Sequence, residues 1–197
     1  NQIGPSEALY NDETLAGDIL KRVDKATGEN VNYRETTTWH DGSAMTDAKV
    51  DGVIYKKVGA KYFELQYDSI LNVRWFGAKG DGITDDTESF RKALNAGKSI
   101  FIPAGKYLVG KLKIPLKLKG QKIFGVGYNH WDSNDGTVLQ AIDTEIFSFE
   151  NGAAWIKISD LRLEGNYNSD YCFNSEFGAN IILDNLGVYN FNEIGIK

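Results

Sequence analysis

The fold is decided by a stretch that reads VRWFGAKGDGITDDTESFRKAL and runs from Val73 to Leu94. Its first four residues, 73–76, predict a short strand. The glycines that follow predict a turn, because glycine adopts a positive φ at little energetic cost; they are Gly77, Gly80 and Gly82. The sequence after the glycines is acidic and favours a helix, so the stretch marks a boundary between two regions of the chain.

A helix is predicted directly after this turn. Asp85 can accept hydrogen bonds from the first free backbone N–H groups, and Glu88, three residues later, completes a capping-box pattern. Acidic side chains in the first turn also suit the positive end of the helix dipole. Apolar side chains then fall on one face at helical spacing. We therefore predict a capping helix whose structural residues are Asp85, Asp86, Phe90 and Leu94.

The chain from Lys98 to Lys197 offers short apolar segments separated by Gly, Asn and Asp. Residues 156–163 and 181–188 match apolar to apolar at four positions, with an offset of 25 residues. One coil per 25 residues or so is typical of repeat architectures. Further apolar runs predict about four coils in all; they lie at 100–102, 107–109, 112–114, 123–126, 138–139 and 146–149.

Residues 77–87, the short helix, and residues 100–109 together resemble the opening of the pectate-lyase-like, polygalacturonase-related right-handed parallel β-helix proteins. That family includes bacteriophage tailspikes and tail fibres, and secreted polysaccharide-degrading enzymes. The resemblance covers residues 70–140 and implies a mainly β fold, namely the start of a right-handed parallel β-helix with an N-terminal capping α-helix. In the family this opening builds a cap and a first coil and performs no chemistry.

Upstream of this opening the pattern predicts a small antiparallel β subdomain, with strand candidates at 36–39, 53–57 and 62–65. Residues 12–25 carry apolar side chains at mixed helical spacings and predict one helix within a polar arm. The chain therefore divides into four predicted regions: a linker or docking arm (1–35), the β subdomain (36–71), the strand, turn and capping helix (72–97), and the first coils (98–197).

The composition excludes several classes of protein. The 197 residues are 42% hydrophobic and 25% charged, which suits a chain with a buried core. The net charge of −5, without a basic stripe, argues against a nucleic-acid binder. A single cysteine, Cys172, excludes an intrachain disulfide, and two histidines, His40 and His130, are too few for a histidine-rich metal site. No apolar run is long enough to span a bilayer, so we predict no membrane insertion. We also predict no metal and no cofactor.

Catalytic patterns are missing from these coils. Polygalacturonase-like hydrolysis needs inward-facing carboxylates on adjacent coils, and the family's Asn-Thr-Asp, Asp-Asp and Gly-His-Gly set is absent. Pectate-lyase-type elimination needs an acidic calcium cluster and a basic residue, and no such cluster can be identified. Asp160 and Asp184, one coil apart, instead predict a polar corner ladder of turn residues. We predict no catalytic residue here; a polysaccharide depolymerase would have its site beyond the C-terminus, where we expect the solenoid to continue.

Two features could bind a polysaccharide. The loop at 125–136 places Tyr128, His130 and Trp131 among polar residues, and aromatic rings of this kind stack on sugars; alternatively, they fold back onto the solenoid wall or lie in a subunit contact. A row of lysines alternates with apolar residues and shares a solvated face, which could contact an acidic polysaccharide or simply discourage aggregation; it comprises Lys111, Lys113, Lys117, Lys119 and Lys122.

The resemblance implies a function that is architectural. We predict the N-terminal portion of a phage tail fibre or tailspike-like receptor-binding protein, which links a glycan-recognising or glycan-degrading β-helix to the virion. Phage members of the family are homotrimers, so a homotrimer is expected, with residues 1–35 docked on other virion tail proteins and a cell-surface polysaccharide as ligand. The predicted location is the virion tail or the extracellular space. The alternatives are a fragment of a secreted polysaccharide lyase or glycoside hydrolase, and a bacterial β-helix surface adhesin.

Overall fold

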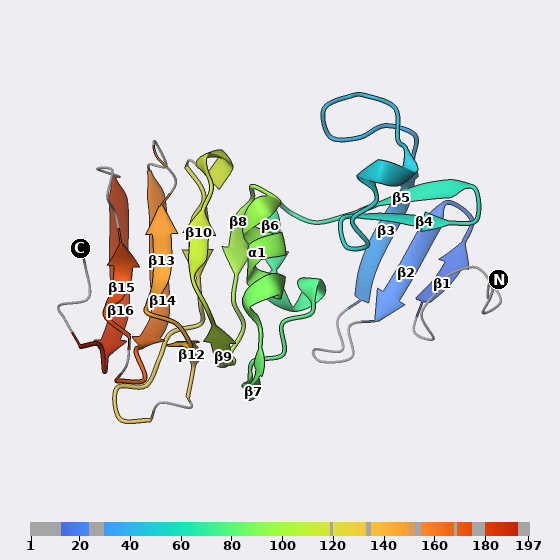
Figure 1. The fold of residues 1–197 in the computed structure, drawn as a ribbon. Coiled ribbons are helices and arrows are strands. Elements are labelled where there is room, and N and C mark those ends of the chain that lie inside the picture. Colours follow the sequence, from blue (N-terminus) through green and yellow to red (C-terminus); the bar gives the residue numbers. More distant parts are fainter. Residues whose placement is uncertain are drawn as a thin grey trace. The chain divides into compact units, whose positions relative to one another are not determined.

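The computed structural model describes residues 13–23, 30–118, 120–132, 135–149, 151, 155–167, 169–174 and 180–192. The chain forms two compact units, Asn1–Asp68 and Ser69–Lys197 (Figure 1). None of the helices formed by the described residues has the length and apolar character needed to cross a membrane.

The first unit is an antiparallel sheet with the strand order β1-β2-β3-β5-β4. Its strands are β1 (Glu13–Ala16), β2 (Ile19–Val23), β3 (Asn30–Thr36), β4 (Tyr55–Val58) and β5 (Lys61–Leu65), and a short 3-10 helix, η2 (Asp47–Lys49), precedes β4. Alternate side chains point into the core, which is why Leu20, Tyr33 and Phe63 are each at most 1% exposed. The predicted strands at 53–57 and 62–65 are confirmed as β4 and β5.

The helix predicted over residues 12–25 is wrong, because β1 and β2 form a hairpin there. Ala16 pairs with Ile19 across a two-residue turn, and Gly17 supplies the positive φ (67°) that such a turn needs. The predicted boundary at residue 35 falls inside β3, so the described part of the predicted arm contributes strands to the sheet. Residues 1–12 of that arm lie outside the described residues.

The second unit consists of short parallel strands that curl into two sheets (Figure 1). One sheet has the order β10-β13-β15. The other has the order β6-β8-β11-β14-β12-β9-β7, with β16 paired to β14. The strands are β6 (Ile70–Asn72), β7 (Asp81–Asp85), β8 (Ser99–Phe101), β9 (Gly105–Val109), β10 (Leu112–Ile114), β11 (Lys122–Phe124), β12 (Thr137–Ala141), β13 (Glu145–Phe149), β14 (Ile156–Glu164), β15 (Tyr171–Asn174) and β16 (Ile181–Tyr189). The unit is therefore mainly β, as predicted.

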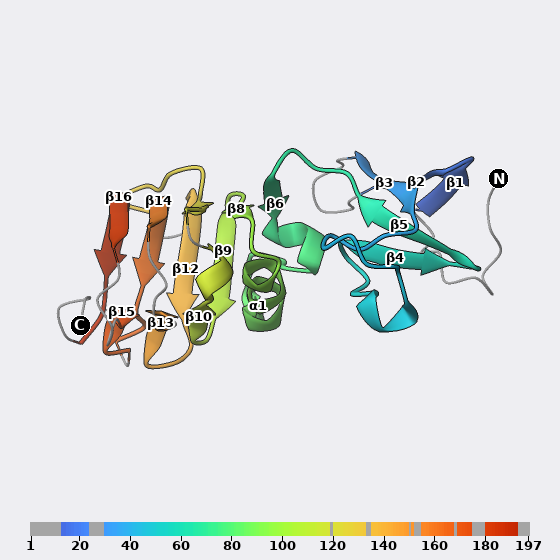
Figure 2. The same ribbon diagram turned by 90° about the horizontal axis from the view of Figure 1, so that it is seen from above.

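Strands β14 and β16 lie side by side (Figure 2). Their register confirms the 25-residue repeat, because Ile156 pairs with Ile181 and Leu163 with Val188. Apolar side chains stack in columns across successive coils. In one column Ile100, Ile123 and Ile158 are neighbours in register, and each is at most 2% exposed. Burial of these columns is the main source of stability in a repeat of this kind.

The decisive stretch differs from prediction at its start. Residues 73–76 form a 3-10 helix, η3 (Val73–Phe76), and the strand comes earlier, as β6. The reason is local: the Asn72 side chain accepts a hydrogen bond from the Arg74 N–H group at 2.9 Å, and Gly77 ends the turn with a φ of 100°. The predicted glycine turn also contains a strand, β7. There Gly80 has a φ of 64°, and a Cβ would lie 2.6 Å from the Tyr107 ring.

The predicted helix is present as α1 (Thr87–Asn95), but its start is built differently. As predicted, Asp85 accepts from an early backbone N–H group, that of Thr87, at 2.9 Å. The capping box does not form, because Glu88 pairs with Arg91 at 2.6 Å. Asp86 accepts from two backbone N–H groups of the preceding loop, at 2.8 and 3.0 Å, while burial raises its pKa. The apolar face of the helix is buried, with Phe90 and Leu94 each 2% exposed, and α1 packs against η3, β9 and β10.

Candidate functional site

The loop between β11 and β12, residues 125–136, is attached to the bend in β14. The Gly127 N–H group donates to the Asp160 carbonyl at 2.8 Å, and the Thr137 N–H group donates to the Gly127 carbonyl at 2.8 Å. Only glycine fits at the start of the loop, since a Cβ on Gly125 would lie 2.4 Å from the Asp160 carbonyl oxygen. Of the loop, residues 125–132 and 135–136 are described.

Tyr128 and His130 hold the loop against the outer wall of β16. Tyr128 is half-buried and lies over Gly187, where a Cβ would be 2.6 Å from the tyrosine ring. The His130 Nδ1 atom shares a hydrogen bond with the hydroxyl group of Tyr189. The Tyr128 ring therefore lies against the wall formed by β16.

A buried ion pair lies beneath this part of the loop. The guanidinium of Arg162 contacts the carboxylate of Glu164 at 2.6 Å, and both side chains are at most 9% exposed. Arg162 also lies 3.9 Å from the centroid of the Tyr189 ring and donates to the His130 carbonyl at 3.4 Å. The remaining oxygen of Glu164 accepts from Asn190. Since both charges have several partners, the pair serves as an anchor for the loop.

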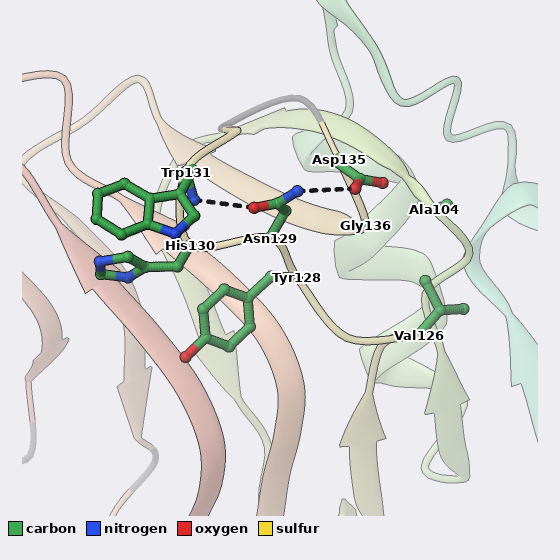
Figure 3. A pocket seen from close by; sticks show the side chains of 8 residues that line it. All are labelled: Ala104, Val126, Tyr128, Asn129, His130, Trp131, Asp135 and Gly136. Atoms are coloured by element: carbon green, nitrogen blue, oxygen red, sulfur yellow. Dashed lines mark hydrogen bonds between the residues drawn. The ribbon is translucent and has the colours of Figure 1, made fainter.

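Trp131 behaves differently from Tyr128, because its side chain is 90% exposed. Its ring meets His130 edge to face, with centroids 4.7 Å apart. Its backbone N–H group donates to Asn129 Oδ1 at 2.9 Å, and Asn129 Nδ2 donates to Asp135 at 3.2 Å (Figure 3). The loop therefore fixes the backbone of Trp131 while its ring stays open to a ligand.

The three predicted residues line one pocket of about 540 Å³ (Figure 3). Sequence reasoning missed Asn129 and Asp135, which are polar residues of the same lining, and the supporting Arg162 and Tyr189. Asn and Asp are also ordinary turn residues, so their part in a pocket gave no separate signal. The 25-residue register could have placed Arg162 beside the wall of β16, but not beneath the loop.

The polar corner predicted at residues 160 and 184–185 is present and is structural. Asp160 and Asn185 both adopt left-handed backbone, with φ values of 59° and 47°, and Asn185 donates to Asp160 at 2.9 Å. This hydrogen bond, with a second from Ser159, holds the pKa of Asp160 below its usual value. Asp184 pairs with Lys157 at 2.7 Å. Among the described residues, no group of three or more His, Cys, Asp or Glu side chains could hold a metal ion.

The lysine row is only partly described. Lys111, Lys113 and Lys122 are exposed, as predicted for a solvated face, and Lys111 pairs with Glu145. Lys119 and the side chain of Lys117 lie outside the described part of the chain. Leu116 is 48% exposed, because it begins the 3-10 helix η4 (Leu116–Leu118) and does not continue the strand alternation.

Comparison with known proteins finds a family model that is similar to the decisive stretch. Residues 70–130 match the model of the rhamnogalacturonase A/epimerase, pectate lyase-like family. A pre-neck appendage protein of Bacillus phage B103 is 36% identical over 116 residues, which cover 57% of this chain and 12% of that protein. The mannuronan C5-epimerase AlgE2 of Azotobacter vinelandii is 33% identical over 114 residues, which cover 48% of this chain and 11% of the enzyme. The chain thus spans about a tenth of the length of these relatives.

A solved structure supports the fold. The tailspike protein gp49 of Acinetobacter baumannii bacteriophage Fri1, a capsular polysaccharide depolymerase, superimposes with a TM-score of 0.62 at 12% identity, covering 88% of this chain and 35% of the tailspike. At this identity the likeness concerns the fold alone. Taken with the sequence matches, it confirms the predicted resemblance to the pectate-lyase-like β-helix proteins, and among them to phage appendage and tailspike proteins.

Proposed function

We propose that this chain is the N-terminal part of a phage tail-associated receptor-binding protein, located in the virion tail, whose β-helix recognises a cell-surface polysaccharide. The sequence similarity to the phage B103 appendage protein, together with the tailspike-like fold, supports the tail association. The exposed ring of Trp131 on a fastened loop is the observation that carries polysaccharide recognition. An amphipathic ring held in this way offers a large contact area to a sugar at little cost in conformational entropy.

In this proposal the segments before the coils are architectural. Helix α1 acts as the N-terminal cap, since Phe90, Ala93 and Leu94 are buried on its apolar face and protect the first strands from edge-to-edge pairing. Residues 1–35 dock on other tail proteins, and three copies of the chain assemble into a homotrimer.

The assembly is tested by measuring the mass of the chain in solution by light scattering, for all 197 residues and after removal of residues 1–12. That truncation spares β1 to β3, which the sheet of the first unit requires. We expect three times the mass of one chain in both cases. A monomer in both cases would contradict the trimer and would favour a single-chain enzyme.

A second candidate function is that of a polysaccharide-modifying enzyme whose active coils lie outside these 197 residues. The similarity to the mannuronan C5-epimerase AlgE2 favours it. The two proposals differ in where the protein is found: antibodies against this chain should label the tails of purified virions if the first proposal holds, and culture supernatant free of particles if the second does.

A further inference from the structure

We infer that the pocket beside Trp131 takes an uncharged saccharide in preference to an acidic one. This inference rests on the proposed polysaccharide recognition and adds the chemical class of the sugar. Its volume of about 540 Å³ lies within the range of small-ligand sites. The argument for the class comes from the charges that line it.

One carboxylate, that of Asp135, is exposed in the described lining of the pocket. Among the described lining residues there is neither a lysine nor an arginine. An acidic sugar seated on Trp131 would therefore face a carboxylate, and like charges at close range repel even in water.

The nearby Arg162 does not change this balance. Its guanidinium is bonded to Glu164 at 2.6 Å and stacked on Tyr189 at 3.9 Å, and the side chain is 8% exposed. The imidazole of His130 is likewise engaged through Nδ1 with the Tyr189 hydroxyl group. The lysines Lys111, Lys113 and Lys122, which could contact an acidic polymer, are not among the residues that line the pocket.

The polar groups of the pocket suit hydroxyl groups. An ionised carboxylate such as that of Asp135 only accepts hydrogen bonds, and sugar hydroxyl groups donate them. One Asp135 oxygen already accepts from Asn129 at 3.2 Å, which orients the carboxylate. A neutral sugar can therefore stack its apolar face on Trp131 and donate to Asp135, whereas a uronic acid would place a second carboxylate there.

The test uses the full chain and a panel of neutral oligosaccharides from mannan, glucan and galactan. Each is also prepared with its C6 hydroxyl groups oxidised to carboxylates, so that the members of a pair share one backbone and differ at C6 alone, where a neutral donor becomes a charged acceptor. Binding is measured by isothermal titration. We expect at least one neutral oligosaccharide to bind, and its oxidised partner to bind about tenfold more weakly or worse, as one added like-charge contact would produce.

Two variants connect this preference to the pocket. Asp135→Asn keeps an acceptor for Asn129 and removes the charge. The ratio of the affinities for the neutral and the oxidised oligosaccharide should therefore fall from about ten towards one. Asp184→Asn removes a charge on β16 that is paired with Lys157 of β14, and it should leave the difference unchanged. Trp131→Ala should weaken binding of both members of the pair.

The outcomes separate this inference from the proposal on which it rests. If an oxidised oligosaccharide binds as tightly as its neutral parent, and Trp131→Ala weakens both, the preference is refuted and polysaccharide recognition stands. If no member of the panel binds, or Trp131→Ala binds like the wild type, both are refuted.

Discussion

Two polar segments of the second unit, the corner at Asp160 and Asn185 and the loop at 125–136, look alike in sequence and differ in structure. At the corner each polar side chain is bonded to the next coil, as in the 2.9 Å hydrogen bond between Asn185 and Asp160. In the loop, Asn129 and Asp135 bond to each other and hold the backbone of an exposed Trp131. Polar residues whose hydrogen bonds join neighbouring coils are structural, whereas polar residues that hold an exposed aromatic residue in place mark a candidate site.

The largest effect on stability is expected from the anchor beneath the loop. Arg162→Ala leaves the carboxylate of Glu164 buried without its charge partner and should lower the free energy of unfolding by about 3 kcal/mol or more. Lys157→Ala, which breaks the exposed pair with Asp184 near the corner, should cost under about 1 kcal/mol. Urea unfolding of both variants gives the comparison. Equal losses would show that the loop is not anchored as described.

The contact between loop and wall is tested at Gly187. A methyl group there would lie 2.6 Å from the Tyr128 ring and 2.7 Å from the Tyr189 ring, so Gly187→Ala should cost about 1 to 3 kcal/mol by overpacking. When Tyr128→Ala is already present, adding Gly187→Ala should lower the free energy of unfolding by less than it does in the wild type, because the Tyr128 ring is no longer there to be overpacked. Strictly additive effects in this double-mutant cycle would show that Tyr128 does not rest on Gly187.

At the corner, Asn185→Ala should cost about 1 to 2 kcal/mol, since alanine tolerates a φ of 47° poorly and cannot donate to Asp160. Asn185→Gly keeps the backbone freedom and loses only the hydrogen bond, so it should cost less than the alanine variant. Thermal unfolding of the pair separates the two contributions. If glycine were the worse of the two, left-handed strain would not be what asparagine relieves.

The smallest expected effect is on pH dependence. The pKa of Asp160 is lowered, chiefly by the Asn185 hydrogen bond, so its contribution to stability is present above the unfolded-state pKa and is lost as pH falls through the folded-state value. The difference in unfolding free energy between the wild type and Asn185→Ala should therefore narrow as pH falls below about 4. A difference that stays constant down to pH 2 would contradict this role.

The parts of the fold that could be predicted are those in which sequence neighbours or a regular repeat decide the structure. The apolar residues of β14 and β16, such as Ile156 and Ile181, reveal the 25-residue period of these two strands, because apolar residues stack on one another in successive coils. The helix starting near Asp85 follows from its local acidic turn and apolar face. By contrast, the sequence of the β1–β2 hairpin predicts a helix. Its strands are too short to show enough apolar–polar alternation to distinguish the strand period of two residues from the helical period of about 3.6.

The candidate site could be predicted only as a loop with aromatic residues. That Tyr128 is packed and Trp131 exposed depends on Gly187 and Tyr189, which lie more than fifty residues further along the chain and reach the loop only through the stacking of coils. The supporting pair of Arg162 and Glu164 points outward from β14, where a charged residue would ordinarily be solvated. Spacing alone does not reveal that the loop covers it.

The central claim, that Trp131 is the binding surface for a saccharide, is tested most directly by comparing Trp131→Ala with Trp155→Ala. Both tryptophans are exposed, at 90% and 58%, and only Trp131 lines the pocket. For a neutral oligosaccharide bound by the wild type, Trp131→Ala should weaken affinity by about thirtyfold, the effect of truncating a central aromatic contact, and leave the free energy of unfolding within about 0.5 kcal/mol. Trp155→Ala should bind like the wild type. Unchanged affinity in Trp131→Ala, or an equal loss in Trp155→Ala, would contradict the claim.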